Sequence, residues 1–137
     1  MLLISQTITL KVAPEAVWRK LIDWKQWPTW DTGQEYIHFD GPIDEYSIGK
    51  LKLKGGPKVL LRVVKFLPGR TYITEFDFVG STFVFDHFLE VIDPEETNLT
   101  FTVATRGFLS LFWGVLLKGS IKKKVPQWME NFRRGLA

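Results

Sequence analysis

The sequence contains no cysteine and only two histidines. Without cysteine there are no disulfides, thiol nucleophiles or cysteine metal ligands, which fits a reducing compartment, so we expect a cytoplasmic protein. Long apolar runs are also missing, since the longest, Phe108–Leu117, has about half of the roughly 20 residues that a membrane-spanning helix needs. Met1–Ile4 has neither the basic segment nor the cleavage site of a signal peptide. We therefore expect no transmembrane segment.

The 137 residues form a chain of 15.9 kDa, too small for two sizeable hydrophobic cores. Hydrophobic residues make up 45% of the chain and charged residues 24%, a balance typical of folded globular proteins. No internal repeat, low-complexity tract or linker is present. We predict a single domain that spans residues 1–137.

Positive charge is concentrated at the C-terminal end. Residues 1–105 carry 11 basic and 14 acidic side chains, a balance of −3, whereas residues 106–137 carry 7 basic side chains and only Glu130 as an acid, a balance of +6. A solvated helix face opposite the acidic remainder is the simplest interpretation. Contact with a membrane surface is an alternative. Nucleic-acid binding is not expected, because no recognition motif accompanies the basic residues.

The first third of the chain predicts one strand followed by two short helices. Apolar and polar residues alternate over Gln6–Val12, which is typical of a half-buried strand. Pro14 is suited to the first position of a helix. The segment Asp23–Trp30, which holds three tryptophans, predicts a second short helical stretch with large apolar side chains.

The middle of the chain predicts strands joined by short turns. Gly, Pro, Ser and Asp occupy the turn positions, and short turns indicate antiparallel neighbours. With the first strand, this gives an α+β fold whose curved antiparallel sheet has about seven strands. The further strands are expected at Glu35–Phe39, Gly49–Lys54, Val59–Leu67, Arg70–Phe78, Thr82–Ile92 and Leu99–Arg106.

The turns Pro68-Gly69 and Gly80-Ser81, taken as two-residue loops, predict the strand register. They place Val63 opposite Thr74, and Thr74 opposite His87. One sheet face then becomes a concave aromatic wall, while the opposite face is mostly charged. The residues expected on the wall are Leu61, Val63, Tyr72, Thr74, Phe76, Phe78, Phe83, Phe85, His87, Leu89, Leu99, Phe101, Val103 and Thr105.

The segment Phe108–Leu136 predicts a long C-terminal helix. Apolar residues recur mostly every three or four positions, so the helix should dock on the sheet, with Trp113 and Trp128 facing it. Pro126 should kink the helix, because proline cannot donate the backbone hydrogen bond. The start of the helix is apolar nearly all round, so part of it needs a ligand, a lid, a partner chain or a membrane surface.

This order of elements resembles the helix-grip fold of the SRPBCC superfamily, which includes START lipid-transfer domains and birch-pollen-allergen-like proteins. The most similar members are the polyketide cyclase/dehydrase-like proteins. The residues that carry the resemblance include Ala13–Trp18, Gly49, Pro68-Gly69 and Arg106-Gly107. The resemblance implies a cavity between the sheet and the long helix that binds a hydrophobic small molecule or a lipid. It implies no universal catalytic residue.

The predicted ligand-binding residues come from the inner sheet face and the facing helix. His87 and Tyr72 are the catalytic candidates, because imidazole and phenol can transfer protons. The alternative for His87 is a core histidine whose nitrogens are satisfied by Thr74 or water. No carboxylate is expected to face inward beside it. The full set is Tyr72, Thr74, Phe76, Phe83, Phe85, His87, Phe101, Val103, Thr105, Trp113 and Trp128.

No metal or cofactor is expected. His38 and His87 should lie on opposite sheet faces, and Gly49-Lys50 lacks the rest of a phosphate-binding loop. Three functions remain open: binding of a hydrophobic molecule, catalysis of the cyclase/dehydrase type, and protein interaction through the apolar start of the long helix. The chain should be a monomer or a homodimer.

Overall fold

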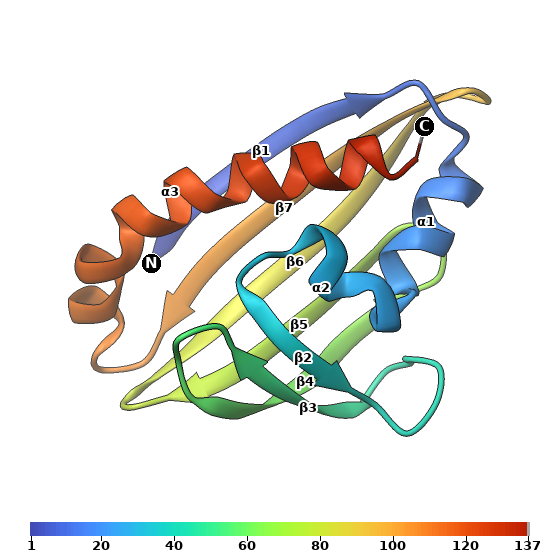
Figure 1. Cartoon of the computed structure of the whole chain (residues 1–137). Helices are drawn as coiled ribbons and strands as arrows, with labels where there is room; N and C mark the ends of the chain where they lie inside the picture. Colours follow the sequence, from blue (N-terminus) through green and yellow to red (C-terminus); the bar gives the residue numbers. More distant parts are fainter. Residues whose placement is uncertain (137) are drawn as a thin grey trace.

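The computed structural model describes residues 1–136 and contains one antiparallel sheet and three α-helices (Figure 1). Two short helices follow the first strand and the longest helix ends the chain, as the sequence predicts. The elements are β1 (Leu2–Leu10), α1 (Pro14–Ile22), the 3-10 turn η1 (Trp24–Gln26), α2 (Trp27–Trp30), β2 (Gln34–His38), β3 (Ile48–Leu53), β4 (Lys58–Leu67), β5 (Thr71–Phe78), β6 (Ser81–Asp93), β7 (Glu96–Arg106) and α3 (Ser110–Arg134).

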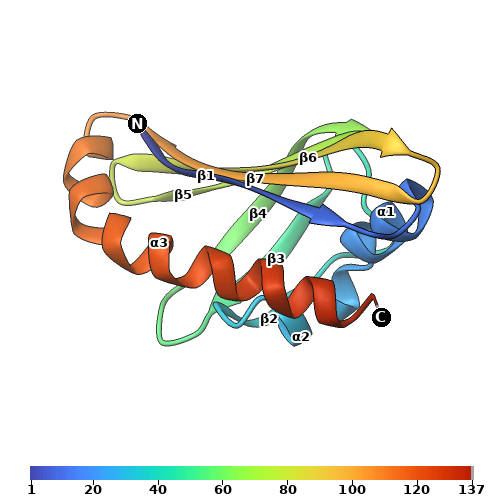
Figure 2. The same ribbon diagram turned by 90° about the horizontal axis from the view of Figure 1, so that it is seen from above.

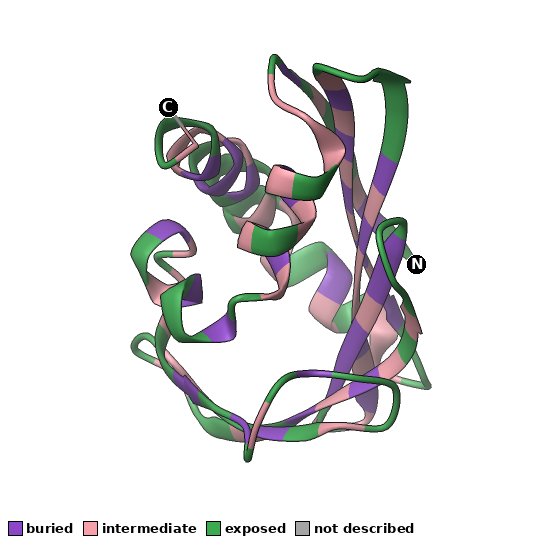
Figure 3. Cartoon of the chain, turned by 90° about the vertical axis from the view of Figure 1, so that its right-hand side faces the viewer, coloured by how far each residue is buried: buried purple, intermediate pink, exposed green. Residues whose placement is uncertain are grey.

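The seven strands are arranged in the order β1-β7-β6-β5-β4-β3-β2, and all neighbours are antiparallel. The long helix α3 lies on one side of this sheet, and α1 lies near the C-terminal end of α3 (Figure 2). Buried residues alternate with more exposed ones along most strands (Figure 3), which is the pattern of a sheet with one covered face. The predicted helix-grip fold class is confirmed.

The predicted register between β4 and β5 is correct for the part of β4 up to Val63 and wrong next to the turn, where Leu67 pairs with Thr71 and the loop has three residues instead of two. Val63 lies opposite Thr74, and Arg62 lies opposite Glu75. A bulge between Val63 and Lys65 then shifts the pairing toward the turn. Before the bulge, the facing residues Val63 and Thr74 are both buried, as expected for the inner face.

The predicted register is wrong between β5 and β6. The two-residue turn is Val79-Gly80 rather than Gly80-Ser81, so Phe78 pairs with Ser81 and Tyr72 pairs with His87. Both turn residues have a positive φ, 26° at Val79 and 74° at Gly80, as a type I′ hairpin turn requires. The sequence does not predict this turn, because valine is an unusual residue at a turn position with a positive φ. The error is two residues, so every side chain stays on its predicted face.

The helix α3 is buried mainly in its C-terminal half. Val125, Trp128, Met129 and Phe132 face the core, whereas Leu111, Phe112, Val115 and Leu116 are exposed. The helix continues through Pro126 without interruption. The half that surrounds and follows Pro126 therefore closes the core. The first turns touch the core on one side, through Trp113 and Gly114, and expose the other side.

Candidate functional site

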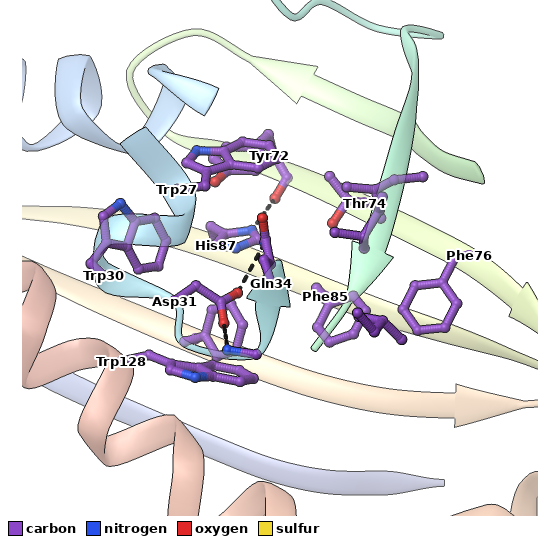
Figure 4. Close-up of a pocket in the computed structure, with 15 residues that line it drawn as sticks. Trp27, Trp30, Asp31, Gln34, Tyr72, Thr74, Phe76, Phe85, His87 and Trp128 are labelled. Atoms are coloured by element: carbon purple, nitrogen blue, oxygen red, sulfur yellow. Dashed lines mark hydrogen bonds between the residues drawn. The ribbon is translucent and has the colours of Figure 1, made fainter. Parts of the chain in front are cut away.

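A cavity lies between the inner face of the sheet, α2 and the C-terminal half of α3. Its empty space is about 540 Å³, counting the part that opens to solvent. Apolar and aromatic side chains form most of its wall (Figure 4). The lining residues are Trp27, Trp30, Asp31, Gly33, Gln34, Leu51, Leu53, Leu61, Tyr72, Thr74, Phe76, Phe85, His87, Phe101 and Trp128.

The structure brings seven of the eleven predicted site residues to this cavity. They come from four elements, β5, β6, β7 and α3. The tryptophans of the α2 segment, Trp27 and Trp30, border the cavity as well. The seven predicted residues are Tyr72, Thr74, Phe76, Phe85, His87, Phe101 and Trp128.

The other four predicted residues lie outside the cavity wall. Phe83 packs against Phe76 with ring centroids 5.2 Å apart, and Val103 is fully buried in the core. The hydroxyl of Thr105 donates to the carbonyl of Ser110 (3.3 Å), at the beginning of α3. The indole of Trp113 donates to the carbonyl of Val79 (2.8 Å), at the β5–β6 turn. Pairing register places a residue on a face, but it does not say where along that face the void lies.

A series of aromatic contacts forms one wall of the cavity. The rings of Phe76 and Phe85 stack with centroids 5.6 Å apart, and Phe101 follows Phe85 at 6.4 Å. Trp128 of α3 meets Phe101 edge-on at 5.8 Å, so this wall connects the sheet to the helix. Such rings offer a large apolar surface with limited conformational freedom.

His87 is a neutral, buried ring in this wall. Its Nδ1 lies 3.3 Å from the backbone oxygen of Tyr72, and its ring stacks on the Tyr72 ring at 4.1 Å. Burial lowers the pKa of His87 to about 3, so the ring carries no charge near pH 7. The backbone of Tyr72, rather than Thr74, thus satisfies one nitrogen. His87 in this state cannot act as a cationic acid.

Tyr72 is held by the first helix. Its hydroxyl donates to the carbonyl of Leu21 at the end of α1 (3.0 Å), and the indole of Trp27 donates to the same carbonyl (2.7 Å). Burial, with the nearby charge of Asp31, raises the pKa of the Tyr72 phenol well above its ordinary value. The phenol therefore stays protonated, and its proton is engaged by the backbone of α1.

Asp31 is a functional candidate that the sequence does not predict. One carboxylate oxygen accepts from the backbone nitrogen of Gly33 (2.9 Å) and the other from the amide of Gln34 (3.0 Å). Burial raises the pKa of Asp31 to about 6, although both hydrogen bonds and the charge of Lys124 act to lower it.

Asp31 brings a carboxylate to the cavity wall, but its hydrogen-bond partners are Gly33 and Gln34 and not His87. Asp31 follows α2 in a loop, where the alternation used for the strands does not apply. The one available signal is its place directly after Trp30, at the end of a segment that is already expected to be buried.

Three buried polar atoms near Asp31 have no hydrogen-bond partner among residues 1–136. They are the indole nitrogens of Trp30 and Trp128 and the side-chain oxygen of Gln34. An unpaired buried polar group costs about 1–3 kcal/mol. All three residues line the cavity, so its α2 end contains both donor and acceptor groups in an otherwise apolar wall.

Across residues 1–136, no group of three or more histidine or acidic side chains is arranged to hold a metal ion. None of the helices in that range is both long and apolar enough to cross a membrane.

A curved antiparallel sheet, closed by a long C-terminal helix over an aromatic-lined cavity, defines a helix-grip protein. The chain belongs to the family described as polyketide cyclase / dehydrase and lipid transport, whose model matches residues 1–136. The family resemblance noted in the sequence is thereby confirmed.

Solved structures of similar fold come from several bacteria. A conserved protein from Geobacillus kaustophilus is 19% identical with a TM-score of 0.74, over 96% of this chain and 93% of that one. A START superfamily protein from Mycobacterium smegmatis is 12% identical with a TM-score of 0.76, over 97% and 95%. The ZhuI aromatase/cyclase from Streptomyces sp. R1128 is 14% identical with a TM-score of 0.76, over 97% and 92%. At these identities the likeness shows the fold alone. No curated protein matches the sequence.

Proposed function

We propose that the protein binds a hydrophobic small molecule or lipid in the cavity between the sheet and α3. The observation that carries this proposal is a partly enclosed space whose wall is mostly aromatic and aliphatic, with a few polar groups at one end. Ligand sites are typically built in this way, because apolar walls supply affinity and a few polar groups set orientation. The family description, which includes lipid transport, supports the same proposal.

The α2 end of the cavity is where a polar group of the ligand would lie. Asp31 and Gln34 form a hydrogen-bonded pair there, and Gln34 keeps one unpaired oxygen. A ligand hydroxyl can donate to such an oxygen. The preferred ligand is therefore an apolar molecule with a hydroxyl or similar group at one end.

The test is a fluorescence titration with the uncharged probe N-phenyl-1-naphthylamine, whose emission rises in an apolar site. Leu53→Trp fills the cavity from β3, where Leu53 is half-buried. Leu60→Trp is the matched control, because Leu60 is 57% exposed and lies outside the cavity. We expect the wild type and Leu60→Trp to bind alike, and Leu53→Trp to bind at least about tenfold more weakly. Equal binding by all three proteins, or no binding by the wild type, would refute the proposal.

A second candidate function is catalysis of the cyclase/dehydrase type. The family description favours it, and one protein of similar fold, ZhuI, is an aromatase/cyclase. His87 and Tyr72 are the candidates from the sequence, yet His87 is held neutral and the Tyr72 proton is engaged. Asp31, with a pKa raised to about 6, is better suited to move a proton near neutral pH.

Substitutions distinguish binding from catalysis. His87→Phe should keep probe affinity within about tenfold if the site only binds, and should abolish turnover of a poly-β-ketone substrate if His87 catalyses. Asp31→Asn makes the same comparison for the carboxylate. If wild-type protein leaves such substrates unchanged while it binds the apolar probe, the catalytic proposal is wrong and the binding proposal stands.

A further inference from the structure

Large apolar side chains are exposed together at one end of the molecule. Four of them come from the start of α3, one is Phe108 just before it, and one comes from the β5–β6 turn. Their exposed fractions range from 57% at Phe112 to 87% at Phe108. We call this set the apolar end: Val79, Phe108, Leu111, Phe112, Val115 and Leu116.

Hydrogen bonds hold the two segments of the apolar end together. The backbone nitrogen of Leu109 donates to the carbonyl of Gly80 (3.0 Å), and the Trp113 indole donates to the carbonyl of Val79 (2.8 Å). These two bonds join the β5–β6 turn to the first turn of α3, segments that lie at the same end of the molecule in Figures 1 and 2.

Val79 extends the apolar end to the tip of the β5–β6 hairpin. It is a β-branched residue with a φ of 26°, a strained conformation that favours glycine or asparagine. Its side chain is nevertheless 62% exposed, so no core packing compensates for the strain. The turn therefore adds one more exposed apolar side chain to those of α3.

Basic residues follow the apolar end along the same side of α3. Lys122 and Lys123 are exposed about three turns after Leu111 and Phe112, a spacing that returns to the same helix face. Residues 107–129 contain four lysines and no aspartate or glutamate. Apolar side chains with lysines next to them are the composition of surfaces that bind anionic membranes.

We propose that the apolar end docks on an anionic phospholipid membrane, with its apolar side chains in the interface and the α3 lysines at the headgroups. Lysine side chains reach headgroup phosphates while their methylene groups remain in apolar contact. A second copy of the chain fits this surface less well. A twofold dimer would bring two positive α3 segments together without acidic partners on that helix before Glu130.

A series of ring contacts connects the apolar end to the aromatic wall of the cavity. Phe78 packs on Trp113 with ring centroids 5.0 Å apart, and Trp113 packs on Phe112 at 5.1 Å. Phe78 follows the cavity residue Phe76 on the same face of β5. Docking would thus hold the aromatic wall of the cavity close to the bilayer.

The experiment is flotation of the full chain with vesicles of phosphatidylcholine, alone or with phosphatidylglycerol, at low and high salt. The apolar variant is Leu111→Ser with Phe112→Ser, and its matched control is Ile48→Ser with Leu60→Ser. The control residues are 58% and 57% exposed and lie on β3 and β4. The charge variant is Lys122→Glu with Lys123→Glu, and its control is Lys50→Glu with Lys65→Glu on the sheet.

We expect binding to phosphatidylglycerol vesicles that falls with salt. Burial of one large side chain corresponds to roughly tenfold or more in partitioning, so the apolar variant should lose at least that factor and its control should not. The charge variant should lose binding, whereas its control keeps most of it. Absence of wild-type binding, or equal losses in variants and controls, would overturn the proposal. So would light scattering that shows a dimer which the apolar variant dissociates, because the surface would then be covered by a second copy.

Discussion

Two titratable side chains in the cavity wall have pKa values that burial shifts in opposite directions. The pKa of Asp31 is raised to about 6, and the pKa of His87 is lowered to about 3. In both cases the low-polarity surroundings favour the neutral form. Near neutral pH His87 therefore adds no cation to the cavity wall, and below about pH 6 Asp31 is mostly uncharged. Of these two groups, only Asp31 is charged near neutral pH, and below about pH 6 both are mostly neutral until His87 protonates near pH 3.

Asp31→Asn should change the pH dependence of stability. Below the ordinary pKa of 3.8, the carboxyl is protonated in both the folded and the unfolded chain, so it has no effect. As pH rises from 3.8 to about 6, the Asp31 carboxyl ionises only in the unfolded chain. The free energy of unfolding of the wild type therefore falls by up to about 3 kcal/mol. Above pH 6 the loss is constant. Urea unfolding at pH 4 and pH 7.5 should show that the stability of the variant relative to the wild type rises between these values. A difference that does not change with pH would contradict the shifted pKa.

His87→Phe should remove a pH dependence of the opposite sign. Above the ordinary pKa of 6.5, the ring is neutral in both states, so its contribution is constant. As pH falls below 6.5, His87 becomes protonated in the unfolded chain, whereas in the folded chain it stays neutral until about pH 3. Folding therefore becomes less favourable as pH falls. The cost is about 3 kcal/mol at pH 4. Comparison of unfolding free energies at pH 7.5 and pH 4.5 tests this, and the wild type should lose more stability than the variant. An NMR titration in which His87 protonates near pH 6.5 in the folded protein would show that its pKa is not lowered.

Among the secondary-structure elements, the junction between β7 and α3 depends on one glycine. Gly107 has a φ of 108°, and a Cβ there would lie 2.8 Å from the backbone oxygen of Gly80. This contact is with backbone at the β5–β6 turn, so it cannot be relieved by turning a side chain. The close approach is what places the first turn of α3 against the hairpin.

Gly107→Ala should therefore destabilise the protein by about 1–3 kcal/mol. Gly119→Ala is the matched control, because Gly119 lies within α3 and a Cβ there would meet open space. This control should stabilise the protein by up to about 1 kcal/mol, since alanine favours a helix. Thermal unfolding of the two variants should shift the midpoint in opposite directions. A neutral Gly107→Ala would mean that the junction is not tightly packed.

The strands show what alternation predicts and what it leaves open. Period-two patterns place Tyr72, Thr74 and Phe76 on the inner face correctly, because that periodicity is a property of the extended chain. The partner of each residue depends on the turn, and the turn at Val79-Gly80 uses an uncommon residue. Face assignment thus survives an error that changes every cross-strand neighbour between β5 and β6.

In the molecule as a whole, the sequence predicts part of the cavity wall, but the position of the cavity is known only from the three-dimensional structure. Residues of the sheet wall are predictable, since each belongs to a regular element. Asp31 and Gln34 are not, because Asp31 lies in the loop after α2 and Gln34 begins the edge strand β2. The exposed start of α3 is predictable as an uncovered apolar segment, but its association with Val79 depends on the fold.

Native mass spectrometry of freshly purified protein shows whether the cavity holds a hydrophobic molecule. The wild type and Leu60→Trp should each show a second mass series with one small molecule per chain, which organic extraction releases. Leu53→Trp, with its cavity filled, should show only the mass of the chain. Binding in the cavity is contradicted if Leu53→Trp retains the molecule as well as Leu60→Trp does, or if the wild type is empty and remains empty after incubation with N-phenyl-1-naphthylamine.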